Sequence, residues 1–132
     1  MTKPVVLITG ALTGIGRAAA LAFAREGASL IVSGRHDDAG RELTAELRSH
    51  GVEAEFVRAD VRRESDVAAL LERTIKRFGR LDVAVNNAGT EGAPGPLTEQ
   101  TPESYAATFD TNVLGVLLSM KHELRVMQPQ GF

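Results

Sequence analysis

Short apolar runs alternate with longer segments of helical periodicity along the chain. Residues 4–8 form a continuous run rich in β-branched residues and predict a buried strand, and further short runs predict strands at residues 29–33, 54–58 and 81–85. Apolar residues at helical spacing predict three intervening helices, at residues 15–26, from a cap at Asp37 or Asp38 to Gly51, and around 67–78. A longer fourth helix begins after Thr101, with Pro102 at its first position, and extends to about Met127.

The strict alternation of strand and helix predicts an α/β fold in which one parallel sheet has helices on both faces. Right-handed crossovers and a doubly wound arrangement place the strands in the order 3-2-1-4. Ligands of such folds bind at the carboxyl ends of the strands, where the order reverses between strands one and four. The residues that follow these two strands are therefore the first candidates for a functional site.

Composition narrows the class of protein. The 132 residues are enough for one domain. The 15 basic and 17 acidic residues give a net charge of −2. This charge favours binding to neither nucleic acid nor an anionic membrane surface. The absence of cysteine excludes disulfide scaffolds and thiolate zinc sites. His36, His50 and His122 lack metal-ligand spacing, so we expect no metal site. The apolar run at 4–8 is too short for a signal peptide, and we expect a cytoplasmic protein.

A glycine-rich segment, residues 9–17, connects the first strand to the first helix. Gly10, Gly14 and Gly16 allow a tight turn and a close approach of the backbone to a ligand, and the helix that follows offers free N–H groups to an anion. Three glycines in seven residues favour a phosphate site over a simple turn. The spacing fits a dinucleotide fingerprint, whereas the P-loop is excluded because the sequence contains no Gly-Lys pair.

With these residues in view, the sequence resembles the short-chain dehydrogenase/reductase family. Its glycine spacing, T-G-x-x-x-G-x-G, is similar to the family's cofactor motif, and residues 86–89, Asn-Asn-Ala-Gly, resemble a second motif after strand four. Asp60-Val61 and the N-x-x-G pattern at Asn112 resemble two further motifs. The resemblance covers essentially the whole chain. It implies a Rossmann fold, a nicotinamide cofactor, and hydride transfer between that cofactor and a small carbonyl or alcohol.

The resemblance also implies roles for individual residues. It assigns Asn86 to linking neighbouring strands and Asn112 to a catalytic tetrad that holds a water for proton relay. It implies that the long helix packs against its copy in another subunit, so we expect a homo-oligomer. The cofactor-binding residues that we expect are Gly10, Thr13, Gly14, Ile15, Gly16, Arg35, Asp60, Val61, Asn87, Ala88 and Gly89.

The end of strand two bears on the choice between NADP and NAD. An acidic residue there would bind the ribose of NAD, whereas a basic residue would meet the 2′-phosphate of NADP. The sequence has Gly34 at the acidic position and Arg35 after it, and a guanidinium suits a phosphate. We therefore expect NADP, with NAD as the alternative if Arg35 is simply a solvated side chain. Asp37 and Asp38 stand close by and weaken the local positive field.

The sequence departs from the family in its catalytic residues. The family's serine and Tyr-x-x-x-Lys are not found, because Tyr105 is the one tyrosine, precedes Asn112, and has Phe109 rather than lysine four residues later. We therefore expect residues 1–132 to form an incomplete NAD(P)-binding Rossmann domain, truncated before a fifth strand and inactive alone. A non-catalytic dinucleotide-binding or interaction module remains the alternative. An extended sugar-nucleotide epimerase fits poorly, because its glycine spacing differs.

Overall fold

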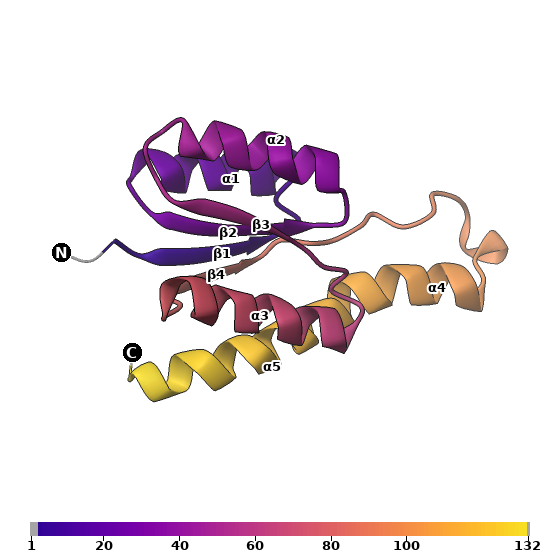
Figure 1. Cartoon of the computed structure of the whole chain (residues 1–132). Coiled ribbons are helices and arrows are strands. Elements are labelled where there is room, and N and C mark those ends of the chain that lie inside the picture. The colour runs from indigo at the N-terminus through magenta and orange to yellow at the C-terminus, as the bar shows by residue number, and fades with distance from the viewer. Residues whose placement is uncertain (1–2, 132) are drawn as a thin grey trace.

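Four parallel strands form the centre of the computed structural model, which describes residues 3–131 (Figure 1). The strands are β1 (Val5–Thr9), β2 (Ser29–Gly34), β3 (Ala54–Arg58) and β4 (Val83–Asn86). The main helices are α1 (Gly14–Arg25), α2 (Asp37–Arg48), α3 (Glu64–Phe78), α4 (Pro102–Phe109) and α5 (Gly115–Met127). The alternation of strands and helices predicted from the sequence is confirmed.

The sheet has the order β3-β2-β1-β4, as predicted for a doubly wound fold. Thr9 at the end of β1 pairs in register with Asn86 at the end of β4, and Ile8 pairs with Val32 of β2. Since all pairs are parallel, the carboxyl ends of the strands meet at one edge of the sheet. The segments that carry the candidate site residues leave the sheet at this edge.

Helices cover both faces of the sheet and bury two separate apolar clusters. Figure 1 shows α1 and α2 on one face and α3 with α5 on the other. Successive side chains of a strand point to opposite faces. Val6 and Ile8 therefore pack in the cluster with α1 and α2, while Leu7 packs with α3 and α5. Because the central strand is apolar on both faces, it appears in the sequence as an unbroken apolar run.

Two boundaries differ from the sequence prediction for local reasons. Strand β4 begins at Val83 rather than Leu81. The backbone of Leu81 instead bonds the Gln130 amide through both N–H and C=O, and the Asp82 carboxylate accepts from Val5 N at 2.8 Å. At α2 the N-cap position belongs to His36, so the prediction of an Asp37 or Asp38 cap is wrong. Both aspartates lie in the first turn, where negative charge favours the helix dipole.

The long helix predicted after Thr101 is interrupted. Thr101 caps α4 in a capping box with Ser104, and Pro102 takes the first helical position, as predicted. A π-helical turn, Asp110–Leu114, then separates α4 from α5. Gly115 follows this turn, and a Cβ there would lie 2.6 Å from Val61 Cγ2. Glycine at this position therefore lets the helix lie close to the end of β3.

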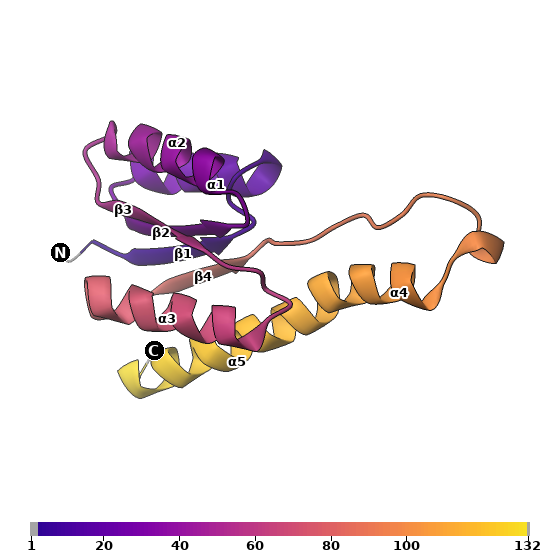
Figure 2. The same ribbon diagram turned by 45° about the vertical axis from the view of Figure 1, so that its right-hand side comes forward.

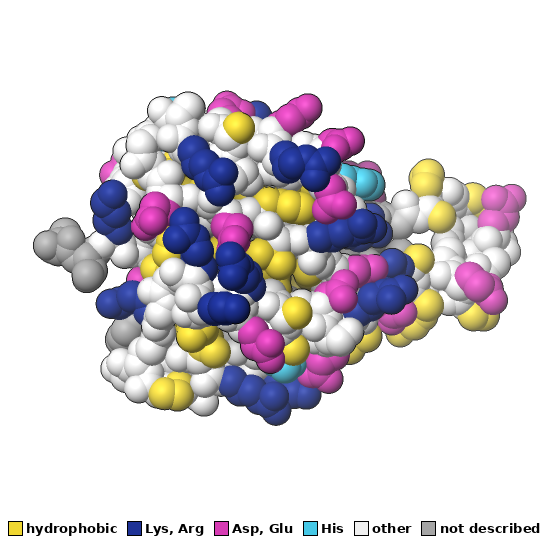
Figure 3. Space-filling model, in the orientation of Figure 1, with side chains coloured by type: hydrophobic (Ala, Val, Ile, Leu, Met, Phe, Trp, Pro, Cys, Tyr) yellow, Lys and Arg dark blue, Asp and Glu magenta, His cyan; other side chains and the backbone are white. Residues whose placement is uncertain are grey.

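Helix α4 projects beyond the sheet on a long connection from β4 (Figure 2). Figure 3 shows hydrophobic side chains among the polar ones on this projecting end. Tyr105 is exposed and stacks on Phe109 with ring centroids 4.4 Å apart. Leu118 of α5 is buried against α3. Over residues 3–131, the structure contains no helix with the length and hydropathy to span a membrane.

Candidate functional site

A cleft of about 830 Å³ opens at the carboxyl ends of the strands. Segments that follow all four strands line it, together with residues of α4 and the π-helical turn. Most of the residues predicted from the sequence lie along its walls: Gly10, Thr13, Gly14, Ile15, Arg35, Asp60, Val61, Asn87, Ala88 and Gly89. Gly16 and Asn112 do not line the cleft themselves. Gly16 packs against Gly10, and Asn112 bonds Thr90, and both of these partners line it. The fold thus brings the predicted residues together, although they span more than half of the chain.

Two glycines of the loop after β1 are required by close packing. A Cβ on Gly10, whose φ is +61°, would lie 2.7 Å from Ala88 Cα. A Cβ on Gly16 would lie 2.2 Å from the Gly10 carbonyl oxygen. Gly16 therefore allows the first turn of α1 to press against the loop. Gly14 differs, because its added Cβ would meet open space and only its φ of +55° favours glycine.

The first turn of α1 faces the cleft. Thr13 occupies its N-cap position in an extended conformation, and the helix begins at Gly14. The first backbone N–H groups of a helix lack intrahelical partners and lie at the positive end of the helix dipole. Ile15 lines the cleft beside them with 82% of its surface exposed, which is unusual for a large aliphatic side chain. This arrangement suits an anion with an apolar neighbour, as in a dinucleotide.

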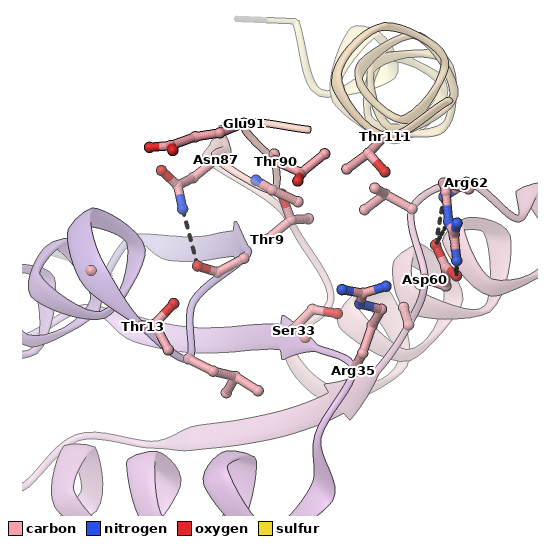
Figure 4. A pocket seen from close by; sticks show the side chains of 18 of the residues that line it. Thr9, Thr13, Ser33, Arg35, Asp60, Arg62, Asn87, Thr90, Glu91 and Thr111 are labelled. Carbon is pink, nitrogen blue, oxygen red and sulfur yellow. Dashed lines mark hydrogen bonds and ion pairs between the residues drawn. The ribbon is translucent and has the colours of Figure 1, made fainter. Parts of the chain in front are cut away.

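The segment after β4 is bonded to the glycine loop. Asn87 Nδ2 donates to the Gly10 carbonyl at 3.0 Å, and Ala88 N donates to Thr9 Oγ1 at 3.2 Å (Figure 4). The two segments that flank the switch point therefore form one connected wall. Thr9 is the threonine of the T-G-x-x-x-G-x-G motif, but the sequence did not indicate that its hydroxyl would bond the segment after β4.

A pair of oppositely charged residues lies across the cleft, at the end of β3. Arg62 donates to the Asp60 carboxylate through Nε at 3.0 Å and Nη2 at 2.7 Å, and through its backbone N at 3.0 Å. The side-chain hydrogen bond from Arg62 is the main reason that the pKa of Asp60 falls to about 2. Arg35, which points toward this pair in Figure 4, lowers it further. Arg62 was missed by sequence reasoning, although it directly follows the Asp60-Val61 motif.

The two aspartates near Arg35, which were expected to weaken its positive field, are paired with other arginines. Asp38 forms an ion pair with Arg41, and Asp37 forms one with Arg58 at 3.5 Å. Each aspartate near Arg35 therefore has another cation as its partner. The preceding residue, Gly34, faces Leu12, and a Cβ at Gly34 would lie 2.6 Å from Leu12 Cδ1. The position at which an acidic side chain would stand is thus occupied by Leu12.

Asn112 lies in the π-helical turn and binds the segment after β4. Its Oδ1 accepts from Thr90 N at 2.8 Å, and its Nδ2 donates to the Thr90 carbonyl at 2.7 Å. Both polar atoms of this side chain are therefore used to hold Thr90, which lines the cleft. In this structure the Asn112 side chain positions a wall of the cleft.

Asn86 departs from the role that the sequence predicted. The family resemblance implies that Asn86 links neighbouring strands, but the Asn86 side chain binds a helix instead. Asn86 Nδ2 donates to Glu123 Oε1 of α5 at 2.8 Å. The amide thereby joins the end of β4 to the helix beneath it.

The acidic and histidine residues do not gather into a metal centre in the part of the chain that is described, residues 3–131. No group of three or more His, Cys, Asp or Glu residues there could hold an ion. The chemistry of the cleft is instead that of backbone N–H groups, asparagine amides and arginines.

Comparison with known proteins identifies the family. The family model described as short chain dehydrogenase matches residues 4–131. The chain is 36% identical over 129 residues to a 3beta-hydroxysteroid dehydrogenase of Mediterraneibacter gnavus, covering 98% of this chain and 47% of that protein. It is 42% identical over 129 residues to the xanthoxin dehydrogenase of Arabidopsis thaliana, covering 96% and 45%. The chain thus spans about half the length of the curated relatives it matches.

Solved structures agree with this result. NAD+-bound xylitol dehydrogenase superposes with a TM-score of 0.94 at 32% identity, covering 98% of this chain and 50% of that one. An actinorhodin polyketide ketoreductase variant with NADPH superposes with a TM-score of 0.89 at 36% identity, covering 94% and 47%. From the family match and these similarities, the chain belongs to the short-chain dehydrogenase family.

Proposed function

We propose that this chain is the cofactor-binding part of an NADP(H)-dependent oxidoreductase that acts on a small carbonyl or alcohol. The observation that carries the proposal is the single cleft formed by the glycine loop, Asp60-Val61 and residues 87–89. The N–H groups that begin α1 would hold the pyrophosphate, and Asn87 keeps the loop in place for it. The bound nicotinamide would supply the hydride donor or acceptor.

The preference for NADP over NAD rests on the end of β2. Arg35 lines the cleft, and the carboxylates next to it are paired with other arginines. An acidic residue suited to the NAD ribose is absent from position 34, where Leu12 fills the adjacent space. A guanidinium that can approach a 2′-phosphate with two donors favours the phosphorylated cofactor.

The test compares Arg35→Ala with Arg25→Ala, which removes an exposed arginine of α1 outside the cleft. A hydrogen bond to a charged group contributes about 1.5–3 kcal/mol, so we expect Arg35→Ala to weaken NADPH binding roughly tenfold or more. Binding of NADH should stay within about twofold, because it lacks the 2′-phosphate. Titration calorimetry measures both. Equal losses for the two cofactors, or an equal effect of Arg25→Ala, would refute the NADP preference.

The catalytic part of the proposal concerns what residues 1–132 can do alone. Asn112 is the one residue assigned to the family's catalytic tetrad, and the Tyr-x-x-x-Lys pattern is not found in the sequence. We expect the chain to bind NADPH without oxidising it in the presence of a panel of carbonyl compounds. Robust turnover would contradict this expectation. Binding without turnover by a longer form carrying the remaining residues would favour a non-catalytic dinucleotide-binding module.

A homo-oligomer and a cytoplasmic location complete the proposal. The oligomer is supported by an apolar face on the π-helical turn and α5, where Val113, Leu117, Met120 and Leu124 are exposed, Leu117 by 57%. Exposed apolar patches of this kind mark interaction surfaces. Sedimentation equilibrium tests the association, and a strictly monomeric chain would contradict it. Fractionation of the source cells tests the location.

A further inference from the structure

Glu123 is a buried carboxyl outside the cleft. It lies on the face of α5 that packs on the sheet, and only 3% of its surface is exposed. Its Oε1 accepts a hydrogen bond from Asn86 Nδ2 at 2.8 Å. Asn86 is the last residue of β4 and immediately precedes the residues that line the cleft. A change at Glu123 can therefore reach the candidate site through a single side chain.

Two oxygens of this pair have no donor. Within residues 3–131, Asn86 Oδ1 and Glu123 Oε2 are both inaccessible to solvent and have no hydrogen-bond partner. An amide oxygen accepts only, and so does each oxygen of an ionised carboxylate. Two acceptors cannot satisfy each other, and leaving both unpaired in the interior is costly. One proton on Glu123 Oε2 would turn that atom into the missing donor.

The groups around Glu123 do not favour its ionised form. On this face of the sheet β4 presents Ala84, and α3 packs through the apolar residues of its buried face. Glu64 of α3 binds both Lys121 and His122 of α5, at 2.7 and 2.8 Å. Both of these side chains are thus committed to another carboxylate. Arg125, the remaining cation of α5, is exposed.

We propose that Glu123 is a neutral carboxylic acid in the folded chain and that its proton joins Oε2 to Asn86 Oδ1. Acid and amide then form a two-way hydrogen-bonded pair that fastens the carboxyl end of β4 to α5. Glu123 is a positioning residue in this arrangement, because it holds the strand from which residues 87–89 extend into the cleft. Ionisation removes the shared proton and restores two opposed acceptors, so the fastening weakens at high pH. Burial of Glu123 raises the pKa of its carboxyl, which also favours the neutral acid.

The discriminating variant is Glu123→Gln, because glutamine carries an N–H₂ donor where the proposal puts the acid proton. It preserves the two-way pair at every pH, whereas Glu123→Ala removes the pair. Glu72→Gln, at an exposed position of α3, is the matched control for losing one glutamate. A carboxyl whose pKa is raised by folding contributes stability below the unfolded value of 4.5 and loses it as the pH rises toward the folded pKa.

Equilibrium unfolding of the full chain should therefore depend on pH in a specific way. Below pH 4.5 the wild type and Glu123→Gln should unfold alike. Above it, the unfolding constant of the wild type should rise relative to that of Glu123→Gln, by up to about tenfold per pH unit, until Glu123 ionises in the fold. Glu72→Gln should keep the wild-type pH dependence. A difference between wild type and Glu123→Gln that does not change with pH would overturn the proposal.

Carbon NMR of the glutamate carboxyls provides a direct readout that requires no unfolding. The resonance that disappears in Glu123→Gln identifies Glu123, and it should keep the shift of a protonated acid at a pH where the other glutamates have ionised. The hydrogen-exchange rates of the Asn87 and Ala88 amides are compared between wild type and Glu123→Gln. The ratio of the wild-type rate to the variant rate should rise as Glu123 titrates. Titration of Glu123 together with the exposed glutamates would refute the neutral form, and a constant exchange ratio would refute the positioning role.

Discussion

Gly16→Ala is the substitution whose effect the structure determines most directly. The added Cβ would lie 2.2 Å from the Gly10 carbonyl oxygen and 2.6 Å from Asn87 Nδ2. Atoms in real structures do not approach this closely, and the carbonyl belongs to main chain that is itself packed against Ala88. The loop must therefore move away from α1, and the hydrogen bond from Asn87 to Gly10 must lengthen or break.

The size of the effect follows from these two consequences. Overpacking a tightly packed site costs about 1–3 kcal/mol, and the lost hydrogen bond about 1 kcal/mol. We expect Gly16→Ala to lower the free energy of unfolding by about 2–4 kcal/mol, within the 5–15 kcal/mol typical of a domain. Because the displaced loop packs against the first turn of α1, whose N–H groups are proposed to hold the pyrophosphate, NADPH binding should fall by about tenfold or more.

Gly14→Ala is the matched control in the same loop. Its Cβ would meet open space, so its cost is limited to the strain of a positive φ, about 1–2 kcal/mol for a non-glycine residue. Urea denaturation of both variants measures the difference in stability, and titration calorimetry measures NADPH binding by Gly16→Ala. If Gly16→Ala is no less stable than Gly14→Ala, the close packing of loop and helix is not what requires glycine at position 16.

Two further predictions test the walls of the cleft. Asn112→Asp keeps the acceptor for Thr90 N but places a carboxylate oxygen against the Thr90 carbonyl. Hydrogen exchange at the Thr90 amide should therefore accelerate about tenfold or more. Unchanged exchange would contradict the positioning role of Asn112. Asp60 is stabilised by Arg62 as an anion, so its contribution to stability is present above pH 3.8 and is lost as the pH falls toward 2. The stability difference between wild type and Asp60→Asn should therefore shrink over that range in acid denaturation, and a constant difference would refute the ion pair's role.

The fold was predictable because its strongest determinants are local. The two central strands, β1 and β2, contain short buried apolar runs, and short local signals mark the helix ends, such as Thr101 and Pro102 at the start of α4. The start of β4 was not predictable in this way. Leu81 is as apolar as a strand residue, but its backbone is bonded by the side chain of Gln130, which lies far along the chain. No local pattern contains that information.

The residues of the candidate site also fall into two groups, those with a local signal in the sequence and those without one. The glycines and the motif residues were found because their spacing and their resemblance to a family are visible in the sequence. Arg62 was missed because its place in the cleft depends on a bidentate contact with Asp60, and many exposed arginines look the same in sequence. Glu123 is the extreme case. It stands between residues that look like an ordinary solvated helix face, and only the packing of α5 on β4 buries it.

The asparagines of the two recognised motifs share one physical role. Asn87 bonds the loop after β1, Asn112 bonds the main chain of Thr90, and Asn86 bonds α5. Each amide joins two elements that are distant in sequence. An amide offers a donor and an acceptor of fixed geometry without a charge that would need a partner in a partly buried wall. Aspartate would lose the donor and add a charge, and leucine would lose both bonds. These positions therefore require asparagine because it fastens the elements that form the cleft, whichever cofactor occupies it.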